Sequence, residues 1–320
     1  MHRVDLVVPG LSNLPVHEFS AEAIDSASPS LQKLFQFAAV SRSEQQDIDD
    51  TLAACLGLES PRLAYASAIE SSAEGAGLLF KPVFLKADIN NAIVFPVTDH
   101  LDELNILIND LSDFFKEDCS IKALPDGAWL MGLHQCSPLT GTPHYLSAMG
   151  KKITHYLEQA SNQLEWFKLI NEMQMFLYQH EVNQARAASG RPTINSLWCW
   201  GADPYQGEHF KDVRWYSDDW LMQRVGQPYC DSASAAEQLA VDGIEGRTII
   251  VNLSVLKALK GEGADDVLEL LQVLEQRYLA PIFDNKSCEL RLHSSAEDTL
   301  IYRPSMRWKF WRRKQRGWFQ

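Results

Sequence analysis

One stretch decides how this chain folds, and it reads Asn183-Gln-Ala-Arg186-Ala-Ala-Ser-Gly190-Arg-Pro192-Thr-Ile-Asn195-Ser-Leu-Trp198-Cys-Trp200-Gly201. Apolar side chains recur at helical spacing in the residues before it, which predicts a helix over residues 159–189. Gly190 lies where a C-terminal cap belongs, and Pro192 prevents the helix from continuing. Ile194–Trp200 alternates and predicts a strand in a buried sheet. The stretch is therefore a corner between a helix and a strand.

The corner combines two tryptophans with polar side chains, which are costly to bury. A shared helix face is expected for Glu172, Gln179, Asn183 and Arg186, which follow one another at intervals of seven, four and three. Two interpretations stay open. In the first, these side chains satisfy buried backbone groups, which need partners whether or not a ligand exists. In the second, they line an anion pocket in which the guanidinium of Arg186 binds a phosphate or carboxylate as a fork. The ligand-binding candidates are Asn183, Arg186, Asn195, Trp198 and Trp200.

The corner also carries a resemblance to known proteins. The pattern N-x-x-R-x-x-x-G, followed by N-x-x-W-x-W-G, resembles a segment of the archaeal-type cofactor-independent phosphoglycerate mutases of the alkaline phosphatase superfamily. It resembles more closely a bacterial group of relatives, the RpfE-type regulatory proteins. The closer resemblance extends to Asn171–Met175, Pro82–Leu85 and Phe310–Arg313. It covers most of the chain, with residues 164–201 as its specific part, and it implies a layered core like that of the superfamily.

Buried strands and amphipathic helices alternate near both ends of the chain, which predicts an α/β fold with a layered core. The strands expected in this core are residues 4–8, 62–69, 248–253 and 288–292. The helices expected beside them are residues 28–40, 43–56 and 265–278, and Ser43 with Gln46 forms a capping box for the second. Residues 202–245 have no pattern that places them.

A different pattern occupies the segment between residues 80 and 135. Two short strands (83–86 and 92–96) precede an amphipathic helix (100–116), and a hairpin (120–124 and 129–133) turns at an Asp-Gly pair. This order predicts an inserted ββαββ subdomain of α+β type. The expected domains are residues 1–79 and 136–302 for the core, 80–135 for the subdomain, and 303–320 for a basic aromatic tail.

The residues do not follow the catalytic pattern that the resemblance implies. Enzymes of the superfamily bind two divalent metals through Asp and His, and the first Asp normally follows the first strand in a hydrophobic-Asp-Gly pattern. Pro9 takes that position here and has no ligand atom. Between residues 248 and 302 the sole histidine is His293, and no Asp-His pair occurs there. The sequence therefore predicts no catalytic residue, no metal and no cofactor.

Three functional hypotheses follow. The preferred one is a catalytically degenerate phosphoglycerate-mutase-like protein that works as a ligand-binding or regulatory protein, with a small phosphorylated or carboxylate ligand. The first alternative is an active metal-dependent phosphoglycerate mutase or phosphatase. Its metal ligands would have to come from other positions, and the candidates, called the reserve ligands below, are Asp203, Asp218, Asp219, His209 and His293. The second alternative is a protein that contacts a membrane or nucleic acid through its tail.

The charge of the chain bears on the third hypothesis. The net charge is −13, but the seven Lys and Arg of residues 303–320 leave 22 basic against 42 acidic side chains in the rest. Within the tail, Arg307–Arg316 interleaves cations with aromatics, a composition typical of membrane-surface or nucleic-acid patches. Because the body is so acidic, we expect the tail to be docked on the protein itself. An external anionic partner is the alternative.

Cysteine usage and hydropathy indicate the compartment. The six cysteines are scattered and form no C-x-x-C pair, which is typical of reduced thiols rather than of disulfides. The first residues do not match the pattern of a signal peptide, so we expect none, and no apolar run reaches membrane-spanning length. We therefore expect a cytoplasmic protein without a transmembrane segment.

Overall fold

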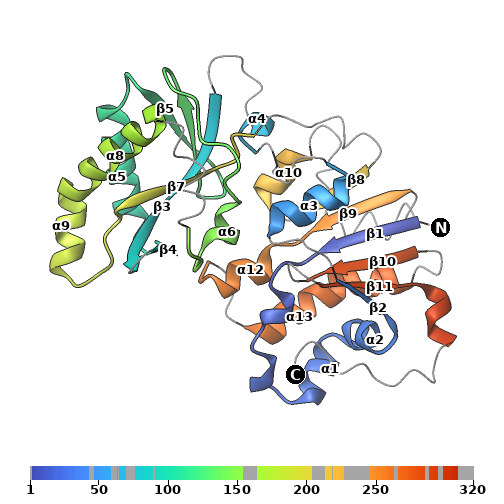
Figure 1. Cartoon of the computed structure of the whole chain (residues 1–320). Coiled ribbons are helices and arrows are strands. Elements are labelled where there is room, and N and C mark those ends of the chain that lie inside the picture. The colour runs from blue at the N-terminus through green and yellow to red at the C-terminus, as the bar shows by residue number, and fades with distance from the viewer. Residues whose placement is uncertain are drawn as a thin grey trace. The chain divides into compact units, whose positions relative to one another are not determined.

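The chain divides into two compact units in the computed structural model (Figure 1). Unit 1 comprises Met1–Pro61 and Gln206–Gln320, and unit 2 comprises Arg62–Tyr205. Unit 2 thus interrupts unit 1 in the sequence. The structure describes residues 2–42, 47–58, 63, 65–69, 76–88, 91–97, 99–153, 164–203, 213–217, 219–226, 246–262, 266–284, 288–294 and 298–308.

The described strands of unit 1 form a six-stranded sheet in the order β2-β11-β10-β1-β9-β8. Their bounds are His2–Val7 (β1), Ala39–Arg42 (β2), Val213–Ser217 (β8), Arg247–Val251 (β9), Cys288–His293 (β10) and Asp298–Tyr302 (β11). Strands β8, β9, β1 and β10 are parallel neighbours, whereas β11 is antiparallel to both β10 and β2. The central strand β1 is buried from Val4 onward, as expected for a parallel strand that is covered on both faces.

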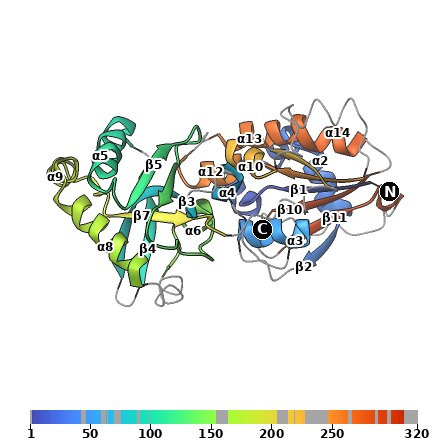
Figure 2. The same cartoon turned by 90° about the horizontal axis from the view of Figure 1, so that it is seen from above.

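Helices cover the two faces of this sheet differently (Figure 2). One face carries α1 (Ala21–Ala27), α2 (Pro29–Phe37), α13 (Val267–Leu274), a π-helix (Glu275–Leu279) and α14 (Ala280–Asp284). Val4 and Leu6 of β1 point into the apolar core beneath these helices, together with Leu34 and Leu271. The other face carries α3 (Ile48–Leu56), and the intervening residue Asp5 points toward it. Two shorter helices, α10 (Trp220–Val225) and α12 (Ser254–Leu259), follow β8 and β9.

Unit 2 contains an antiparallel sheet built around one long strand, β3 (Ala76–Asp88). The partners of β3 are β4 (Asn91–Pro96), β6 (Trp129–Leu133) and β7 (Ser196–Trp200), and β5 (Cys119–Ala123) pairs with β6. Helices α5 (Leu101–Phe114) and α8 (Leu164–Gln179) pack apolar side chains on this sheet, among them Leu107 and Met173. The remaining helices are α4 (Tyr65–Ile69), α6 (Tyr145–Ala148) and α9 (Glu181–Ala188).

The predicted fold class is confirmed, because the chain has a layered α/β core and the order β3-β4-α5-β5-β6 gives the ββαββ block. The segment 80–135 lies within unit 2. That unit also includes α8, α9 and β7, because β7 pairs with β3 and α8 packs on β7. Among the described helices, none combines the length and the apolar character needed to cross a bilayer.

Four local predictions were wrong in part. Residues 65–69 form α4 instead of a strand, and the alanines of this short segment favour a helix. The helix expected over residues 28–40 ends at Phe37, because residues 39–42 pair with β11 as β2. The helix expected over residues 43–56 begins at Ile48, where Asp47 caps α3 by accepting from the Asp50 amide. The expected capping box of Ser43 and Gln46 lies outside the described residues and stays a prediction.

The fourth concerns the long helix expected over residues 159–189, of which residues 164–189 are described. It breaks at His180 into α8 and α9. The backbone of His180 is extended, and its imidazole Nδ1 accepts a hydrogen bond from the Val182 amide at 3.2 Å. This side chain therefore caps a new helix, and the buried apolar positions shift at the break, from Leu177 to Val182.

Gly226 provides a test of the packing in unit 1. Its backbone is ordinary, but an added Cβ would overlap the buried indole of Trp215. We expect Gly226→Ala to lower the free energy of unfolding by about 1–3 kcal/mol, because the core must shift to relieve the overlap. Urea unfolding measures this change. Gly77→Ala is the control, since its Cβ would make only ordinary contacts, and equal losses in both variants would contradict the packing described.

Candidate functional site

The helix–strand corner in unit 2 is held by Asn183, which is buried between α9 and β7. Its Nδ2 donates to the carbonyl oxygens of Leu177 and Ile194 at 2.6 and 2.7 Å. Its Oδ1 accepts from the Ile194 amide at 2.7 Å. The carboxamide therefore fastens the strand entry to the end of α8, and its polar atoms are engaged by the backbone.

Arg186 is the most deeply buried cation of the corner, with 1% of its surface exposed. Nε donates to the Pro192 carbonyl oxygen at 2.8 Å, Nη1 to Glu103 Oε2 at 3.0 Å, and Nη2 to Asp99 Oδ1 at 2.8 Å. Arg191 binds the same Glu103 carboxylate through both of its terminal nitrogens. The guanidinium thus faces anions that the protein itself supplies from the start of α5.

The other three candidates lie in β7 or directly before it. Asn195 exchanges two hydrogen bonds with the backbone of Leu85, at 2.7 and 2.9 Å. Trp198 Nε1 donates to the Pro143 carbonyl oxygen, and Trp200 stacks on Tyr145. Trp200 Nε1 has no acceptor among the described residues. The structure therefore brings all five candidates into one unit with mostly internal partners, which favours the structural interpretation. An anion pocket at this corner stays a prediction.

The ends of the parallel strands in unit 1 form the edge where α/β proteins commonly bind ligands. Pro9 follows β1, Asn252 follows β9 and Ser217 ends β8. The Ser217 hydroxyl donates to the Val251 carbonyl oxygen at 2.7 Å. Asp219 accepts from the Met222 amide through Oδ1 and from Lys257 Nζ through Oδ2, at 3.0 and 2.5 Å. The Asp219 carboxylate is thus paired with a cation of its own unit.

The other reserve ligands are dispersed. Asp203 belongs to unit 2 and accepts from the Gly141 amide at 3.5 Å. His293 is the last residue of β10, level with the end of β1, and its partners are described next. Asp218 and His209 lie outside the described residues. Within unit 1, the two described reserve ligands, Asp219 and His293, have different partners and do not belong to a common group of possible metal ligands.

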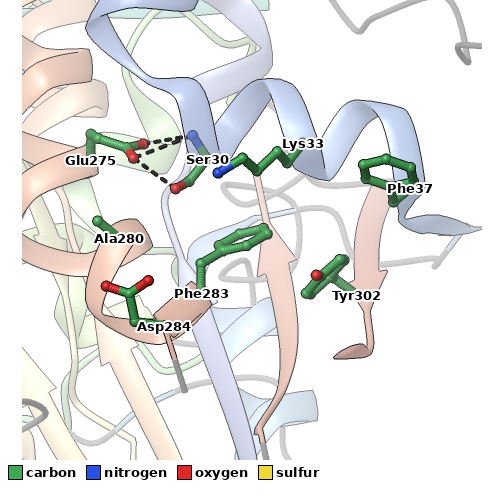
Figure 3. Close-up of a pocket in the computed structure, with 8 residues that line it drawn as sticks. All are labelled: Ser30, Lys33, Phe37, Glu275, Ala280, Phe283, Asp284 and Tyr302. Carbon is green, nitrogen blue, oxygen red and sulfur yellow. Dashed lines mark hydrogen bonds between the residues drawn. The ribbon is translucent and has the colours of Figure 1, made fainter. Parts of the chain in front are cut away.

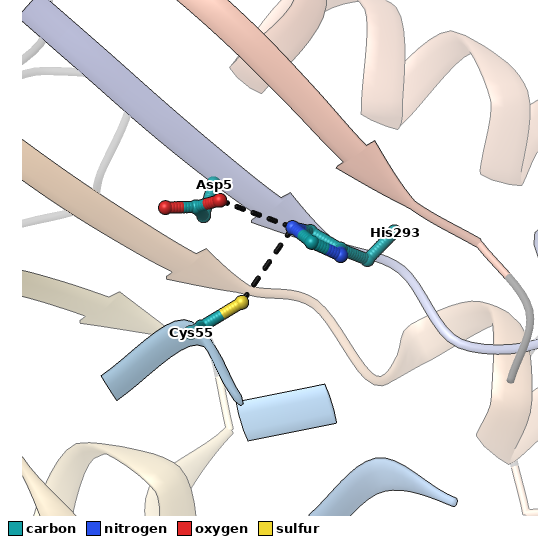
Figure 4. A group of neighbouring side chains, drawn as sticks. All are labelled: Asp5, Cys55 and His293. Atoms are coloured by element: carbon teal, nitrogen blue, oxygen red, sulfur yellow. Dashed lines mark hydrogen bonds and ion pairs between the residues drawn. The ribbon is translucent and has the colours of Figure 1, made fainter. Parts of the chain in front are cut away.

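Sequence reasoning missed a buried cluster formed by Asp5, Cys55 and His293 (Figure 4). His293 Nε2 lies 3.1 Å from Asp5 Oδ1 and 3.5 Å from Cys55 Sγ. The other ring nitrogen, Nδ1, lies 3.1 Å from the Thr299 hydroxyl. Both Asp5 and the thiol contact the same nitrogen, so the three side chains are not arranged as a nucleophile–base–acid relay. The only sequence signal was an aspartate inside an otherwise apolar strand.

Charges around this cluster set its ionisation. Burial opposes ionisation of Asp5, but hydrogen bonds and charges from His293 and Arg3 outweigh it, and the pKa of Asp5 is lowered. Arg3 contacts both carboxylate oxygens, and Arg247 Nε lies 3.7 Å from Oδ2. Burial, with a contribution from the Asp5 charge, raises the pKa of the Cys55 thiol to about 12. Asp5 is therefore ionised and Cys55 is protonated at neutral pH.

A pocket of about 480 Å³ opens beside the π-helix of unit 1 (Figure 3). Glu275 forms part of its wall and accepts from the Ser28 hydroxyl and from the amide and hydroxyl of Ser30, so that this carboxylate anchors the start of α2. Phe283 and Tyr302 provide an aromatic surface, with ring centroids 4.6 Å apart. The pocket also has exposed charges of both signs, Lys33 and Asp284.

Comparison with known proteins gives distant structural similarities. The chain is similar to the PH0037 protein from Pyrococcus horikoshii, with 14% identity, a TM-score of 0.49, and coverage of 94% of this chain and 87% of that chain. It is also similar to a cofactor-independent phosphoglycerate mutase from Thermoplasma acidophilum, with 15% identity, a TM-score of 0.43, and coverage of 95% and 90%. No protein-family model and no curated protein matches the chain. Similarity at this level says nothing about activity, and membership of the RpfE-type group stays a prediction.

The structural interpretation of the corner predicts the effect of removing Arg186. We expect Arg186→Ala to lower the free energy of unfolding by about 1–3 kcal/mol, because the Pro192 carbonyl loses its donor and two carboxylates lose a cation. Urea unfolding measures the change. Arg191→Ala is the control, since it shares Glu103 but is more exposed, and we expect it to cost less. A fully stable Arg186→Ala variant would contradict the structural role.

The same network predicts a dependence of stability on pH. Hydrogen bonds from Arg191 and Arg186 lower the pKa of Glu103, and Arg186 overcomes the opposing effect of burial to lower the pKa of Asp99. A carboxylate whose pKa is lowered by folding stabilises the protein above its unfolded pKa, which is about 4. That contribution is lost as the pH falls through the lower pKa of the folded state. We therefore expect urea midpoints to fall below about pH 4 more steeply in the wild type than in an Asp99→Asn, Glu103→Gln variant. Parallel curves would contradict the assignment.

Proposed function

We propose that this protein is a ligand-binding or regulatory protein of phosphoglycerate-mutase-like ancestry that does not perform metal-dependent phosphoryl transfer. The observation that carries the proposal is the commitment of Asp219 to Lys257 and to the cap of α10. The sequence resemblance at the helix–strand corner supports the ancestry.

The chemistry of phosphoryl transfer explains why this commitment matters. A two-metal site needs several carboxylates and imidazoles that converge on ions about 3.5–4 Å apart. At the described strand ends, Pro9 offers no ligand atom and the Ser217 hydroxyl is donated to the backbone. Asp219 already forms an ion pair, because the Lys257 ammonium contacts its Oδ2 at 2.5 Å. A metal would have to displace that ammonium and recruit further ligands.

The pocket of unit 1 is the place where we propose that the ligand binds. Its volume of about 480 Å³ lies within the range of small-molecule sites. Lys33 offers an ammonium to a carboxylate or phosphate, and the aromatic surface of Phe283 and Tyr302 suits an apolar part of the same molecule. Glu275 accepts hydrogen bonds from Ser28 and Ser30, which hold it in the wall of the pocket.

Two alternatives remain distinct. An active mutase or phosphatase would need ligands such as Asp218 and His209, which lie outside the described residues. A tail-mediated protein would use Arg307–Arg316, of which residues 309–316 lie outside the described residues. We propose that the tail is docked on the acidic body, since its aromatic side chains are costly to keep in water.

Ligand-induced stabilisation tests the pocket, because a molecule that binds only the native state raises its melting temperature. We expect 3-phosphoglycerate, or another small carboxylate from a panel, to raise the melting temperature of the wild type. Lys33→Met should abolish the rise. Lys168→Met, which removes an exposed lysine from unit 2, should retain it. An equal rise in Lys33→Met would place the ligand elsewhere.

Activity assays on the same samples separate binding from catalysis. With Mn²⁺ present, we expect no mutase or phosphatase turnover above that of a heat-inactivated sample. Turnover that disappears in Asp219→Asn would contradict the proposal and favour the enzyme alternative.

A further inference from the structure

The cluster of Asp5, Cys55 and His293 joins three elements of unit 1 that are far apart in the sequence. Asp5 lies in β1, Cys55 in α3 and His293 in β10, and each side chain is buried. One carboxylate oxygen, the sulfur and one imidazole nitrogen all lie within 4.8 Å of one another. We propose that these three side chains bind one zinc ion on the α3 face of the sheet (Figure 4).

The ligand types and their spacing carry the proposal. Zinc binds thiolate, imidazole and carboxylate in tetrahedral sites, with bonds of about 2.0–2.3 Å, which place neighbouring ligand atoms about 3.3–3.6 Å apart. The separations here are 3.5 Å between Cys55 Sγ and His293 Nε2, and 3.1 Å between His293 Nε2 and Asp5 Oδ1. Only small movements are needed to admit the ion. Sulfur and imidazole ligands select zinc over magnesium or calcium.

The outer contacts of the cluster resemble those of metal ligands. A zinc-bound histidine generally uses its second ring nitrogen for another hydrogen bond, and His293 Nδ1 lies 3.1 Å from the Thr299 hydroxyl. Ligating carboxylates are themselves hydrogen-bonded, and Arg3 Nη2 donates to Asp5 Oδ1 at 2.8 Å. An oxygen has two lone pairs, so Oδ1 can accept from Arg3 and still coordinate the ion.

The positive charge of nearby arginines is the main factor that opposes zinc binding. The carboxylate of Asp5 and the thiolate of Cys55 together balance a divalent ion, and zinc takes the place of the thiol proton. Arg3 and Arg247 add positive charge nearby, but their side chains are 30% and 31% exposed, so water screens them in part. Their contacts with Asp5 also keep this carboxylate ionised and in place.

The bound zinc would fasten α3 to the centre of the sheet. Three protein ligands leave a fourth position for water. The three ligands lie on the α3 face of the sheet, and none of them lines the pocket beside the π-helix, so the test of the zinc site is independent of the proposed ligand pocket. A pair of metal ions bound elsewhere would be recognised by a stoichiometry of more than one metal per chain and by its independence from Cys55.

Metal analysis of tag-free, full-length protein from zinc-supplemented cells tests the site. After dialysis, we expect about one zinc per chain in the wild type, in keeping with a three-residue tetrahedral site. Cys55→Ala should lose at least about nine-tenths of it, since a lost ligand sharply weakens binding. Cys288→Ala should keep it, because this buried thiol of β10 contacts the Glu289 carbonyl oxygen instead.

Cobalt replacement gives a readout that does not depend on the stability of the variants. Co²⁺ added to metal-free wild-type protein should produce a thiolate-to-cobalt charge-transfer band, which Cys288→Ala keeps and Cys55→Ser loses. Absence of this band in folded wild-type protein would overturn the proposal. Equal zinc contents in the wild type and Cys55→Ala would overturn it as well.

Discussion

A charged side chain inside this fold is stable only where its own unit supplies a partner, because an uncompensated buried charge is very costly. Arg186 meets Asp99 and Glu103, Glu275 meets the hydroxyls of Ser28 and Ser30, and Asp219 meets Lys257. Besides compensating buried charge, each of these contacts joins two separate elements of its unit.

The Arg186 contacts show how such a pair shapes the path of the chain. The guanidinium binds the Pro192 carbonyl oxygen on one side and the start of α5 on the other. Asn183 adds bonds to Leu177 and Ile194. Together they fix the turn between α9 and β7, and β7 then enters the sheet beside β3. The polar residues of the corner thereby organise unit 2, which leaves the pocket of unit 1 as the better place for a ligand.

The sequence allowed prediction of features that depend on local pattern. Periodicity located α5, and the Asp-Gly turn located the hairpin of β5 and β6. Short strands such as β2 and β11 could not be predicted, because their pairing and not their composition makes them strands. The partners of Arg186 lie 83 and 87 residues away, and His293 lies 288 residues from Asp5. Charge compensation over such separations is set by tertiary structure, so Arg186 could be identified as important while its partners could not.

A double-mutant cycle tests most directly whether Arg186 is committed to the carboxylates of its own unit. Urea unfolding would be measured for the wild type, Arg186→Ala, Asp99→Ala and the double variant. Groups in contact generally show coupling of at least about 0.5 kcal/mol, and we predict coupling of this size or more. Losses that add to within about 0.3 kcal/mol would contradict the account. Additive losses would instead favour the interpretation in which Arg186 binds an external anion.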